Sequence, residues 1–200
     1  MKKLLLGSNN VGKLREMQEL LEGVEVALVT PASIGLRLEV KEDGTTYAEN
    51  AARKALAFAR QSGLLTLADD SGLEVEALEG APGLRSARFA PQPGATDADR
   101  RAYLLQQLRG KPHPWSARFR CTVALTNPAG DPFFTEGICP GEIIPQERGD
   151  NGFGYDPIFL LPEIGKTMAE LSMEEKNRLS HRARAVKAAI PTLLEWLSFY

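Results

Sequence analysis

The sequence predicts an α/β fold built on a mixed β-sheet, and three observations predict it. Between Lys3 and Ala68, short apolar segments alternate with segments of helical periodicity. Two segments of alternating polarity, Ala117 to Leu125 and Phe133 to Cys139, flank the turn sequence Asn127 to Asp131 and predict an antiparallel hairpin. A stripe of apolar residues from Leu179 to Leu197 predicts a long C-terminal helical segment. Alternating strands and helices favour parallel pairing, so the hairpin makes the sheet mixed.

The N-terminal segments follow the pattern strand, helix, strand. We expect a short buried strand over Lys3 to Leu6 and a second strand over Val24 to Thr30. Between them, a helix ends before Gly23. Its apolar face consists of Leu14, Met17, Leu20 and Leu21.

The next helix and strand lead to a pair of acidic residues. Thr46 and Glu49 have capping-box spacing at the start of a helix that ends before Gly63. The apolar segment Leu64 to Ala68 then reads as a buried strand that ends in a polar turn, Asp69 to Gly72. A half-exposed strand is expected to follow the turn.

Two further helices are expected. One covers Thr96 to Leu108. The other is the C-terminal segment, which we expect to kink or split at Pro191. Off the apolar stripe, the first turns of that same segment carry Lys176, Arg178, His181 and Arg182, close enough to converge on an anion or a carbonyl oxygen. The alternative is that this basic helix face is only solvated.

Composition limits the class of protein. The 200 residues fit one domain, and 43% hydrophobic and 25% charged residues are ordinary for a globular chain. A net charge of −2 argues against binding a nucleic acid polymer, so a bound anion should meet a few local cations. No segment reads as a signal sequence or membrane span, and we expect a cytoplasmic protein. Cys121 and Cys139 lie in strand-like segments and are expected to be reduced.

Adjacent acids after a buried strand suggest a metal site. The carboxylates of Asp69 and Asp70 repel each other and could share a cation, most simply Mg²⁺, which prefers oxygen ligands. The alternative is that they only cap a turn. The turn Ser8 to Lys13 could likewise cap a helix or bind phosphate, because helix N-terminal N–H groups attract anions. Its spacing is not that of a Walker loop.

Two more segments offer polar groups. Asn50 and Lys54 share a helix face and could reach the same crevice, although such residues often only face solvent. The glycine-rich segment Gly149 to Phe159 contains Phe153, Tyr155 and Asp156. This segment could bind a nucleobase, with an aromatic ring stacked on the base and a polar side chain hydrogen-bonded to its edge. The alternative is a glycine turn with packed aromatic rings.

Taken together, these segments resemble the inosine triphosphate pyrophosphatase family, also called the Ham1 family. The resemblance spans nearly the whole chain, and the ordered set of motifs is specific although each motif alone is not. The motifs are Ser8-Asn9-Asn10-Val11-Gly12-Lys13, Glu49-Asn50-Ala51 with Lys54, Ala68-Asp69-Asp70-Ser71-Gly72-Leu73, Gly80-Ala81-Pro82-Gly83, Phe153-Gly154-Tyr155-Asp156-Pro157, Glu175-Lys176-Asn177 and Ser180-His181-Arg182.

The resemblance implies a fold and an activity. The fold is an elongated mixed β-sheet with an antiparallel hairpin arm, flanking helices and two lobes around a central cleft, formed by a single domain over residues 1–200. The activity is the Mg²⁺-dependent hydrolysis of ITP, dITP and XTP to the monophosphate and pyrophosphate by a cytoplasmic homodimer, which removes deaminated purines from the nucleotide pool.

The resemblance also implies roles for individual residues. Asp70 would accept the proton and bind Mg²⁺ together with Glu39, chosen over Glu42 in the acidic loop before the Glu-Asn-Ala helix. Asp69, Asn50 and Lys54 are additional candidates. Substrate would contact Ser8, Asn9, Asn10, Val11, Gly12, Lys13, Ser71, Phe153, Gly154, Tyr155, Asp156, Lys176, His181 and Arg182.

Two other functions fit parts of the sequence. A nucleotide-binding sensor without turnover would keep Lys13 and Phe153 but would not require two acidic segments. A phosphatase with a phosphoenzyme intermediate on Asp69 or Asp70 is disfavoured because these two residues do not have the expected DxD spacing.

Overall fold

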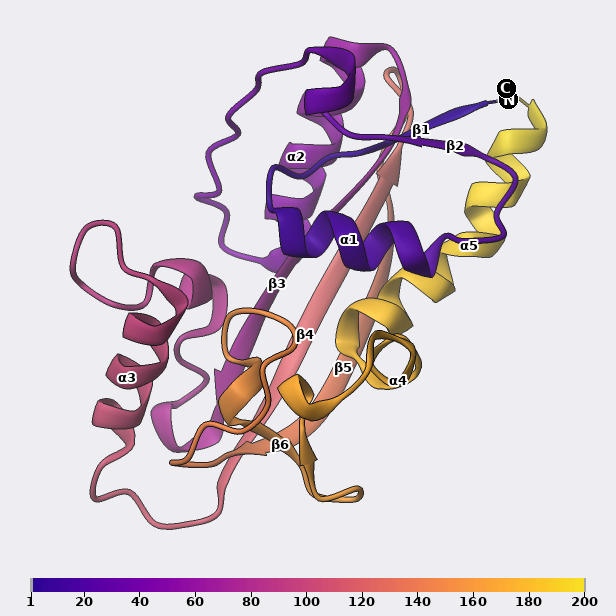
Figure 1. Ribbon diagram of the computed structural model, residues 1–200. Helices are drawn as coiled ribbons and strands as arrows, with labels where there is room; N and C mark the ends of the chain where they lie inside the picture. Colours follow the sequence, from indigo (N-terminus) through magenta and orange to yellow (C-terminus); the bar gives the residue numbers. More distant parts are fainter. Residues whose placement is uncertain (1, 200) are drawn as a thin grey trace. The chain divides into compact units, whose positions relative to one another are not determined.

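The structure is a computed structural model that describes residues 2–199 (Figure 1). Its main feature is one mixed seven-stranded sheet with the strand order β2-β1-β3-β4-β5-β6-β7. The strands are β1 (Lys3–Leu6), β2 (Ala27–Val29), β3 (Leu65–Val75), β4 (Trp115–Thr126), β5 (Phe133–Ile143), β6 (Phe159–Leu161) and β7 (Lys166–Thr167). The helices are α1 (Val11–Leu20), α2 (Tyr47–Ser62), α3 (Asp97–Leu108), α4 (Met173–Leu179) and α5 (His181–Phe199).

The pairing of the strands confirms the predicted mixed sheet. β1 pairs in parallel with both β2 and β3, whereas β6 pairs antiparallel with β5 and β7. β4 and β5 are neighbours joined by the turn over 127–132, which is the predicted hairpin. No helix in the described part of the chain has the length and apolarity that crossing a bilayer requires.

The chain divides into two compact units, which agrees with the expected two lobes. Unit 1 consists of Met1–Asp70, Cys121–Gly137 and His181–Tyr200, and unit 2 of Ser71–Arg120 and Ile138–Ser180. Strands β3, β4 and β5 each contribute residues to both units. The cleft between lobes, the elongated shape and the single-domain organisation stay predictions.

Unit 1 has a helix layer on each face of its strands. Helices α1 and α5 contact each other and pack with Leu65 and Leu67 of β3 in one apolar cluster (Figure 1). Ala51 and Ala55 of α2 pack in a separate cluster that contains Ala68 of β3. Because side chains alternate along a strand, odd-numbered residues in the unit 1 part of β3, from Leu65 to Asp70, face α1 and α5, and even-numbered residues there face α2.

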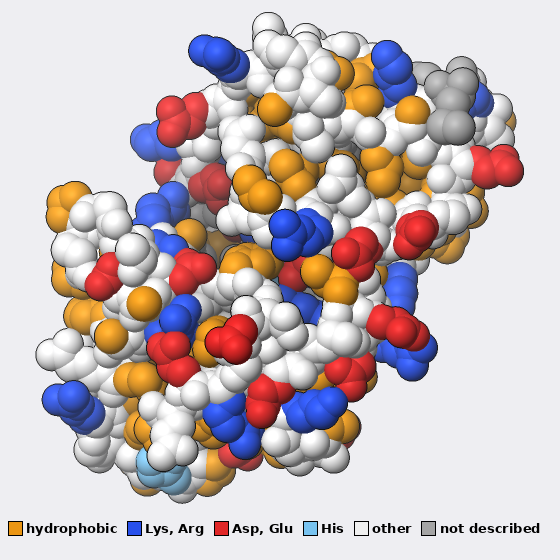
Figure 2. Space-filling view, in the orientation of Figure 1, with side chains coloured by type: hydrophobic (Ala, Val, Ile, Leu, Met, Phe, Trp, Pro, Cys, Tyr) orange, Lys and Arg blue, Asp and Glu red, His pale blue; other side chains and the backbone are white. Residues whose placement is uncertain are grey.

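Unit 2 has its own apolar core. Leu73 and Val75 of β3 pack there with Leu104 and Leu108 of α3 and with the buried Phe159 of β6. The N-terminus of α3 is closed by the capping box that Thr96 forms with Asp99. Cys121 and Cys139 are both buried and form no disulfide, as predicted. Acidic and basic side chains are interspersed over the face seen in Figure 2.

Two details of the sequence prediction were wrong. β3 does not end at a polar turn after Ala68: it runs through Asp69 to Gly72 as one strand up to Val75, because its neighbour β4 continues alongside it. What does end is β1, whose Leu6 pairs with Leu67. The acids therefore lie on β3 just beyond the end of its parallel neighbour.

The C-terminal helical segment is interrupted at Ser180, not at Pro191. Ser180 has an extended backbone (φ −68°, ψ 155°), which is the conformation of an N-cap and is favourable for serine. α5 continues through Pro191. Proline has no backbone N–H, so one carbonyl in the preceding turn loses its helical partner. Pro191 is exposed, and this carbonyl can therefore bond to water. Lys176 consequently belongs to α4 in unit 2, and His181 and Arg182 belong to α5 in unit 1, so the prediction of one shared helix is wrong.

Candidate functional site

The predicted phosphate turn precedes α1 in unit 1. Asn10 is the N-cap of α1, and its Oδ1 accepts a hydrogen bond from the Lys13 backbone N–H at 3.0 Å. Ser8 Oγ accepts from the Asn10 N–H at 3.2 Å, and Asn9 Nδ2 donates to the Leu38 carbonyl at 3.0 Å. The turn is thus shaped by its own polar side chains, and it leaves the exposed Val11 at the helix start.

Lys13 connects this turn to β3. Its Nζ lies 3.1 Å from Asp69 Oδ2, and the Asp69 side chain is fully buried while Lys13 remains partly accessible. Burial on its own would raise the pKa of Asp69, but the positive charges of Lys13 and Arg182 lower it well below its usual range. Asp69 is therefore ionised at neutral pH. Its Oδ1 is buried and has no hydrogen-bond partner among the described residues.

Arg182 occupies the centre of a buried ion network. Its Nε donates to Asp69 Oδ2 at 3.2 Å, and its Nη1 donates to Glu16 Oε2. Burial would lower the pKa of Arg182, but the two carboxylates raise it above its usual value, so the guanidinium stays charged. The predicted role of Arg182 in binding the nucleoside stays a prediction, since in this structure its guanidinium binds two carboxylates.

Glu16 was missed by the sequence prediction. It is only 3% exposed, and it lies one helical turn after Lys13 on α1. The signal was available: Glu16 is a charged residue next to Met17 within the apolar stripe of α1. A buried carboxylate at such a position requires a cationic partner, which Arg182 provides.

Asp70 has different partners from Asp69. Its Oδ2 accepts a hydrogen bond from Asn50 Nδ2 at 2.9 Å, and its Oδ1 lies 3.9 Å from Lys54 Nζ. Burial raises the pKa of Asp70 above its usual value, and Glu42 raises it further, although Lys54 and Lys13 act in the opposite direction. Both Asn50 and Lys54 come from α2, so two of the additional candidates are indeed brought to Asp70.

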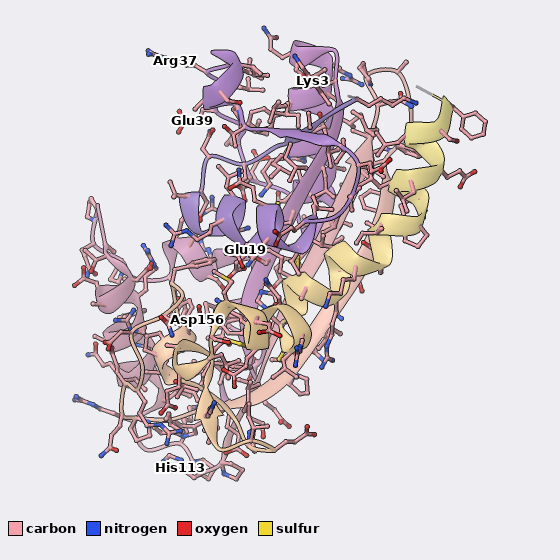
Figure 3. The ribbon with its side chains drawn as sticks, turned by 45° about the vertical axis from the view of Figure 1, so that its right-hand side comes forward. Lys3, Glu19, Arg37, Glu39, His113 and Asp156 are labelled. Atoms are coloured by element: carbon pink, nitrogen blue, oxygen red, sulfur yellow. The ribbon has the colours of Figure 1, made fainter. Side chains whose placement is uncertain are left out.

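The acidic loop before α2 brings Glu42, not Glu39, close to Asp70. Glu42 Oε2 lies 3.2 Å from Lys54 Nζ, the same ammonium that approaches Asp70. Glu39 is exposed on the preceding part of the loop (Figure 3). The assignment of Glu39 as a metal ligand stays a prediction, and the geometry favours the alternative that the sequence offered.

The donor set near Asp70 suits Mg²⁺. No group of three or more His, Cys, Asp or Glu side chains is clustered for a metal within residues 2–199. Mg²⁺ does not need one, because it usually keeps several waters and binds one or two carboxylates together with substrate phosphates. Asp70 and Glu42 would supply such carboxylates, whereas the Asp69 carboxylate is held by Lys13 and Arg182.

The predicted base-binding residues lie in unit 2. Asp156 Oδ2 accepts hydrogen bonds from Lys176 Nζ at 2.6 Å and from the Phe153 N–H at 2.9 Å. Lys176 Nζ also lies 5.2 Å from the centre of the Phe153 ring. A side chain at Gly152 would collide with Asp156, since a Cβ there would lie 2.1 Å from Oδ2. Phe153, Asp156 and Lys176 therefore form one compact cluster.

Neighbouring groups fix the glycine-rich segment around this cluster. The Gly154 N–H donates to Asp97 Oδ2 at 2.7 Å, and Arg101 Nη1 donates to the Gly154 carbonyl at 2.9 Å. The buried Tyr155 donates its hydroxyl to the Ser86 carbonyl at 2.9 Å. Of these two aromatic residues, Phe153 is half-buried, whereas Tyr155 is buried.

Ser71 and His181 complete the set of predicted residues. Ser71 follows Asp70 on β3 and is half-buried, and His181 is buried at the start of α5. Their roles in binding substrate stay predictions.

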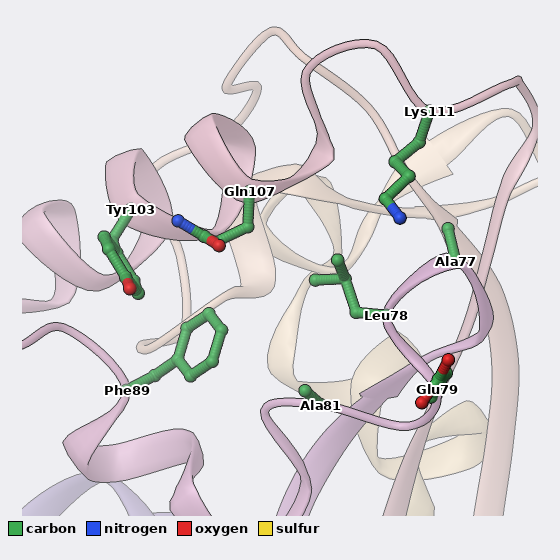
Figure 4. A pocket seen from close by; sticks show the side chains of 8 residues that line it. All are labelled: Ala77, Leu78, Glu79, Ala81, Phe89, Tyr103, Gln107 and Lys111. Atoms are coloured by element: carbon green, nitrogen blue, oxygen red, sulfur yellow. The ribbon is translucent and has the colours of Figure 1, made fainter.

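A pocket elsewhere in unit 2 contains none of the predicted site residues (Figure 4). Phe89 and Tyr103 line it with their rings edge to face, 5.1 Å apart, and Leu78 and Lys111 lie nearby. Its charged side chains are exposed, so it lacks the buried polar group that would orient a ligand.

The mixed sheet and the buried cation and carboxylate network define an α/β protein with a candidate phosphate and metal site. The family model described as the Ham1 family matches residues 4–192. The chain belongs to the Ham1 family.

Similar proteins cover nearly the full length of the chain. A dITP/XTP pyrophosphatase of Desulforamulus reducens is 49% identical over 96% of this chain and 95% of its own length. A dITP/XTP pyrophosphatase of Thermus thermophilus is 46% identical over 94% of this chain and 90% of its own. The solved structure of a HAM1 protein from Coxiella burnetii matches with a TM-score of 0.87 and 42% identity, covering 98% of this chain and 100% of that chain.

Proposed function

We propose that this protein hydrolyses the non-standard purine nucleoside triphosphates ITP, dITP and XTP to the monophosphate and pyrophosphate. The observation that carries the proposal is the 3.1 Å ion pair between Lys13, in the first turn of α1, and Asp69, next to Asp70 on β3. This ion pair supports the proposal because it brings the start of α1, where a phosphate could bind, to the residue that precedes Asp70, the carboxylate that would hold Mg²⁺. The names of the similar proteins support the substrate class.

The polyphosphate would bind at the N-terminus of α1. The N–H groups of the first helical turn have no partner within the helix and attract anions. Lys13 adds a full positive charge there, which Asp69 orients. These groups need no rearrangement during the reaction, so they can stabilise the charge that develops as the bond to pyrophosphate breaks.

Asp70 would orient the attacking water and accept its proton. It would also hold Mg²⁺ together with Glu42, with Glu39 as the alternative. When bound, Mg²⁺ neutralises charge on the phosphate oxygens and on the leaving pyrophosphate. Asn50 and Lys54 would fix the direction of the Asp70 carboxylate.

The base would be recognised by the cluster of Phe153, Asp156 and Lys176. The Phe153 ring offers a surface for stacking. Hypoxanthine and xanthine present an acceptor oxygen where adenine presents an amino group, so a cationic donor such as Lys176 would pair with the former only. A site built around such hydrogen bonds rejects a mismatched analogue strongly.

A panel of triphosphates tests this proposal. Purified protein is incubated with ITP, dITP, XTP, dGTP and dATP in the presence of Mg²⁺, and phosphate is measured with and without added inorganic pyrophosphatase. A signal that appears only with the added enzyme, and mainly for ITP, dITP and XTP, supports the proposal. Tight binding of ITP without any turnover would contradict it and favour a nucleotide sensor.

The resemblance also implies a homodimer in the cytoplasm, which we keep as part of the proposal. Size-exclusion chromatography with light scattering measures the mass in solution. A monomeric mass at the concentrations used for the activity assay would contradict the dimer while leaving the proposed reaction intact.

A further inference from the structure

Asn50 joins two segments that both carry acidic residues. Its Nδ2 donates a hydrogen bond to Asp70 Oδ2 at 2.9 Å, on β3. Its Oδ1 accepts a hydrogen bond from the Gly44 backbone N–H at 2.8 Å, in the loop that carries Glu42. One side-chain amide therefore connects the acidic loop to the Asp70 carboxylate, with a donor on one side and an acceptor on the other.

The connection is buried, which makes it costly to break. Asn50 is 1% exposed, and Asp70 is 6% exposed. Water therefore cannot easily replace either hydrogen bond, and a buried polar group without its partner is destabilising.

Gly44 permits the close approach of the loop. A Cβ at this position would lie 2.6 Å from Asn50 Oδ1 and 2.9 Å from Glu49 Cβ, both too short for real contacts. Any side chain at residue 44 would push the loop away from the amide. The loop can donate its Gly44 N–H to Asn50 Oδ1 only because residue 44 is glycine.

Lys54 places a positive charge between the acidic loop and Asp70. Its Nζ lies 3.2 Å from Glu42 and 3.9 Å from Asp70, and it comes from α2, one turn after Asn50. Lys54 attracts both carboxylates but imposes no direction on them, because an ammonium is a point charge with rotatable donors. Directional control comes from the amide.

We propose that Asn50 is a positioning residue that ties the acidic loop to Asp70 and so sets the spacing of the Glu42 and Asp70 carboxylates for a divalent cation. The inference rests on the proposed function for its kinetic consequence. Its structural consequence can be tested without substrate or metal. Outer residues that orient metal ligands commonly change metal affinity or activity about 10- to 100-fold when removed.

The first test uses metal-free protein. Amide hydrogen exchange is followed by NMR in wild type and in Asn50→Ala. The Gly44 N–H should exchange about 3- to 10-fold faster in the variant, because it loses its acceptor. The Glu49 N–H, which donates to Thr46 Oγ1 at the start of α2, should exchange at the wild-type rate and serves as the internal reference.

The second test breaks only the hydrogen bond between the acidic loop and Asn50, and leaves the bond from Asn50 to Asp70 in place. Gly44→Ala keeps the Asn50 amide but displaces the loop. We expect both Asn50→Ala and Gly44→Ala to raise the Mg²⁺ concentration for half-maximal pyrophosphate release, and the dissociation constant of Mg²⁺ measured by calorimetry, by about 10- to 100-fold. The KM for ITP at saturating Mg²⁺ should change less than the Mg²⁺ requirement does.

The chain offers matched controls. A Cβ at Gly130, in the turn between β4 and β5, would lie 2.8 Å and 2.9 Å from the side-chain amide atoms of Asn127. Gly130→Ala and Asn127→Ala therefore disturb the same kind of contact between a glycine and an asparagine without touching the acidic loop. Both controls should bind Mg²⁺ like wild type.

Two results would overturn the inference. One is unchanged Gly44 exchange in Asn50→Ala, and the other is a Mg²⁺ affinity in both site variants equal to that of the controls. If Asn50→Ala does not fold, as judged by circular dichroism, Gly44→Ala still provides the test. Failure of the proposed function looks different: wild type would then release no pyrophosphate, while the exchange and calorimetry experiments would still report on the Asn50 connection.

Discussion

Asp69 and Asp70 are neighbours on β3, but their carboxylates lie on opposite faces of the sheet. Asp69 binds Lys13 of α1 and Arg182 of α5, whereas Asp70 binds Asn50 of α2. Although Asp69 and Asp70 are adjacent in the sequence, this adjacency alone does not bring their carboxylates to one shared cation. Asp69 and Asp70 should therefore respond differently to the same Asp→Asn substitution.

Asp70→Asn should abolish most turnover and preserve the fold. The amide removes the proton acceptor and the metal-binding charge but can still accept a hydrogen bond from Asn50. Losing one charge-stabilising group commonly lowers turnover about 100- to 1,000-fold. The assay is pyrophosphate release from ITP at saturating Mg²⁺, with circular dichroism as the check of folding. Turnover close to that of wild type would remove Asp70 from the mechanism.

Asp69→Asn should mainly lower stability. Removing its charge leaves the buried guanidinium of Arg182 with one carboxylate instead of two and frees Lys13. Breaking a buried ion pair on one side typically costs about 3 to 5 kcal/mol. Urea denaturation measures the free energy of unfolding. The control is Glu174→Gln, which breaks the exposed pair with Arg178 and should leave stability unchanged. Equal stability of the two variants would contradict the importance of the buried network.

Phe153→Ala should lower kcat/KM for all substrates to a similar extent. Stacking of a base on an aromatic ring is worth about 1 to 3 kcal/mol and does not depend strongly on which base it is. We expect kcat/KM for dITP and dATP to fall by about the same factor, within 10- to 100-fold, so the preference for dITP persists. Steady-state kinetics on the two triphosphates decide this. A variant that no longer prefers dITP over dATP but keeps its activity on dITP would show that Phe153 discriminates between bases.

Asp97 should make stability depend on pH. Burial would raise the pKa of Asp97, but the Gly154 N–H and the Arg100 side chain bind the carboxylate and lower its pKa below the usual range. A pKa that is lower in the folded state stabilises the fold above the unfolded-state pKa, and this stabilisation is lost as the pH falls through both values. Asp97→Asn should thus be less stable than wild type at pH 7.

Urea denaturation of both proteins between pH 7 and about pH 3 measures this difference. We expect the gap in free energy of unfolding to narrow as the solution becomes more acidic. A gap that stays constant or widens toward low pH would show that Asp97 is not preferentially ionised in the folded protein.

Local patterns were sufficient for most of the secondary structure. Apolar periodicity located α1 and α2, with the Thr46 cap marking the start of α2, and the range Thr96 to Leu108 predicted α3. The hairpin of β4 and β5 followed from alternation and a turn sequence. The break at Ser180 was missed because serine within a helical pattern is compatible with either a continuous helix or a new N-cap.

The sequence by itself determined the mixed α/β class and the chemistry of the candidate site, because periodicity and residue type are local properties of the chain. Only the tertiary structure decided which charges pair. It joined Glu16 to Arg182 across most of the chain length, sent Asp69 and Asp70 to different helices, and brought Glu42 to the Lys54 ammonium. Such pairings depend on which faces of a strand and a helix meet after packing. A buried charge is stable only beside a partner that the fold has carried there, and the spacing of residues along the sequence does not contain that information.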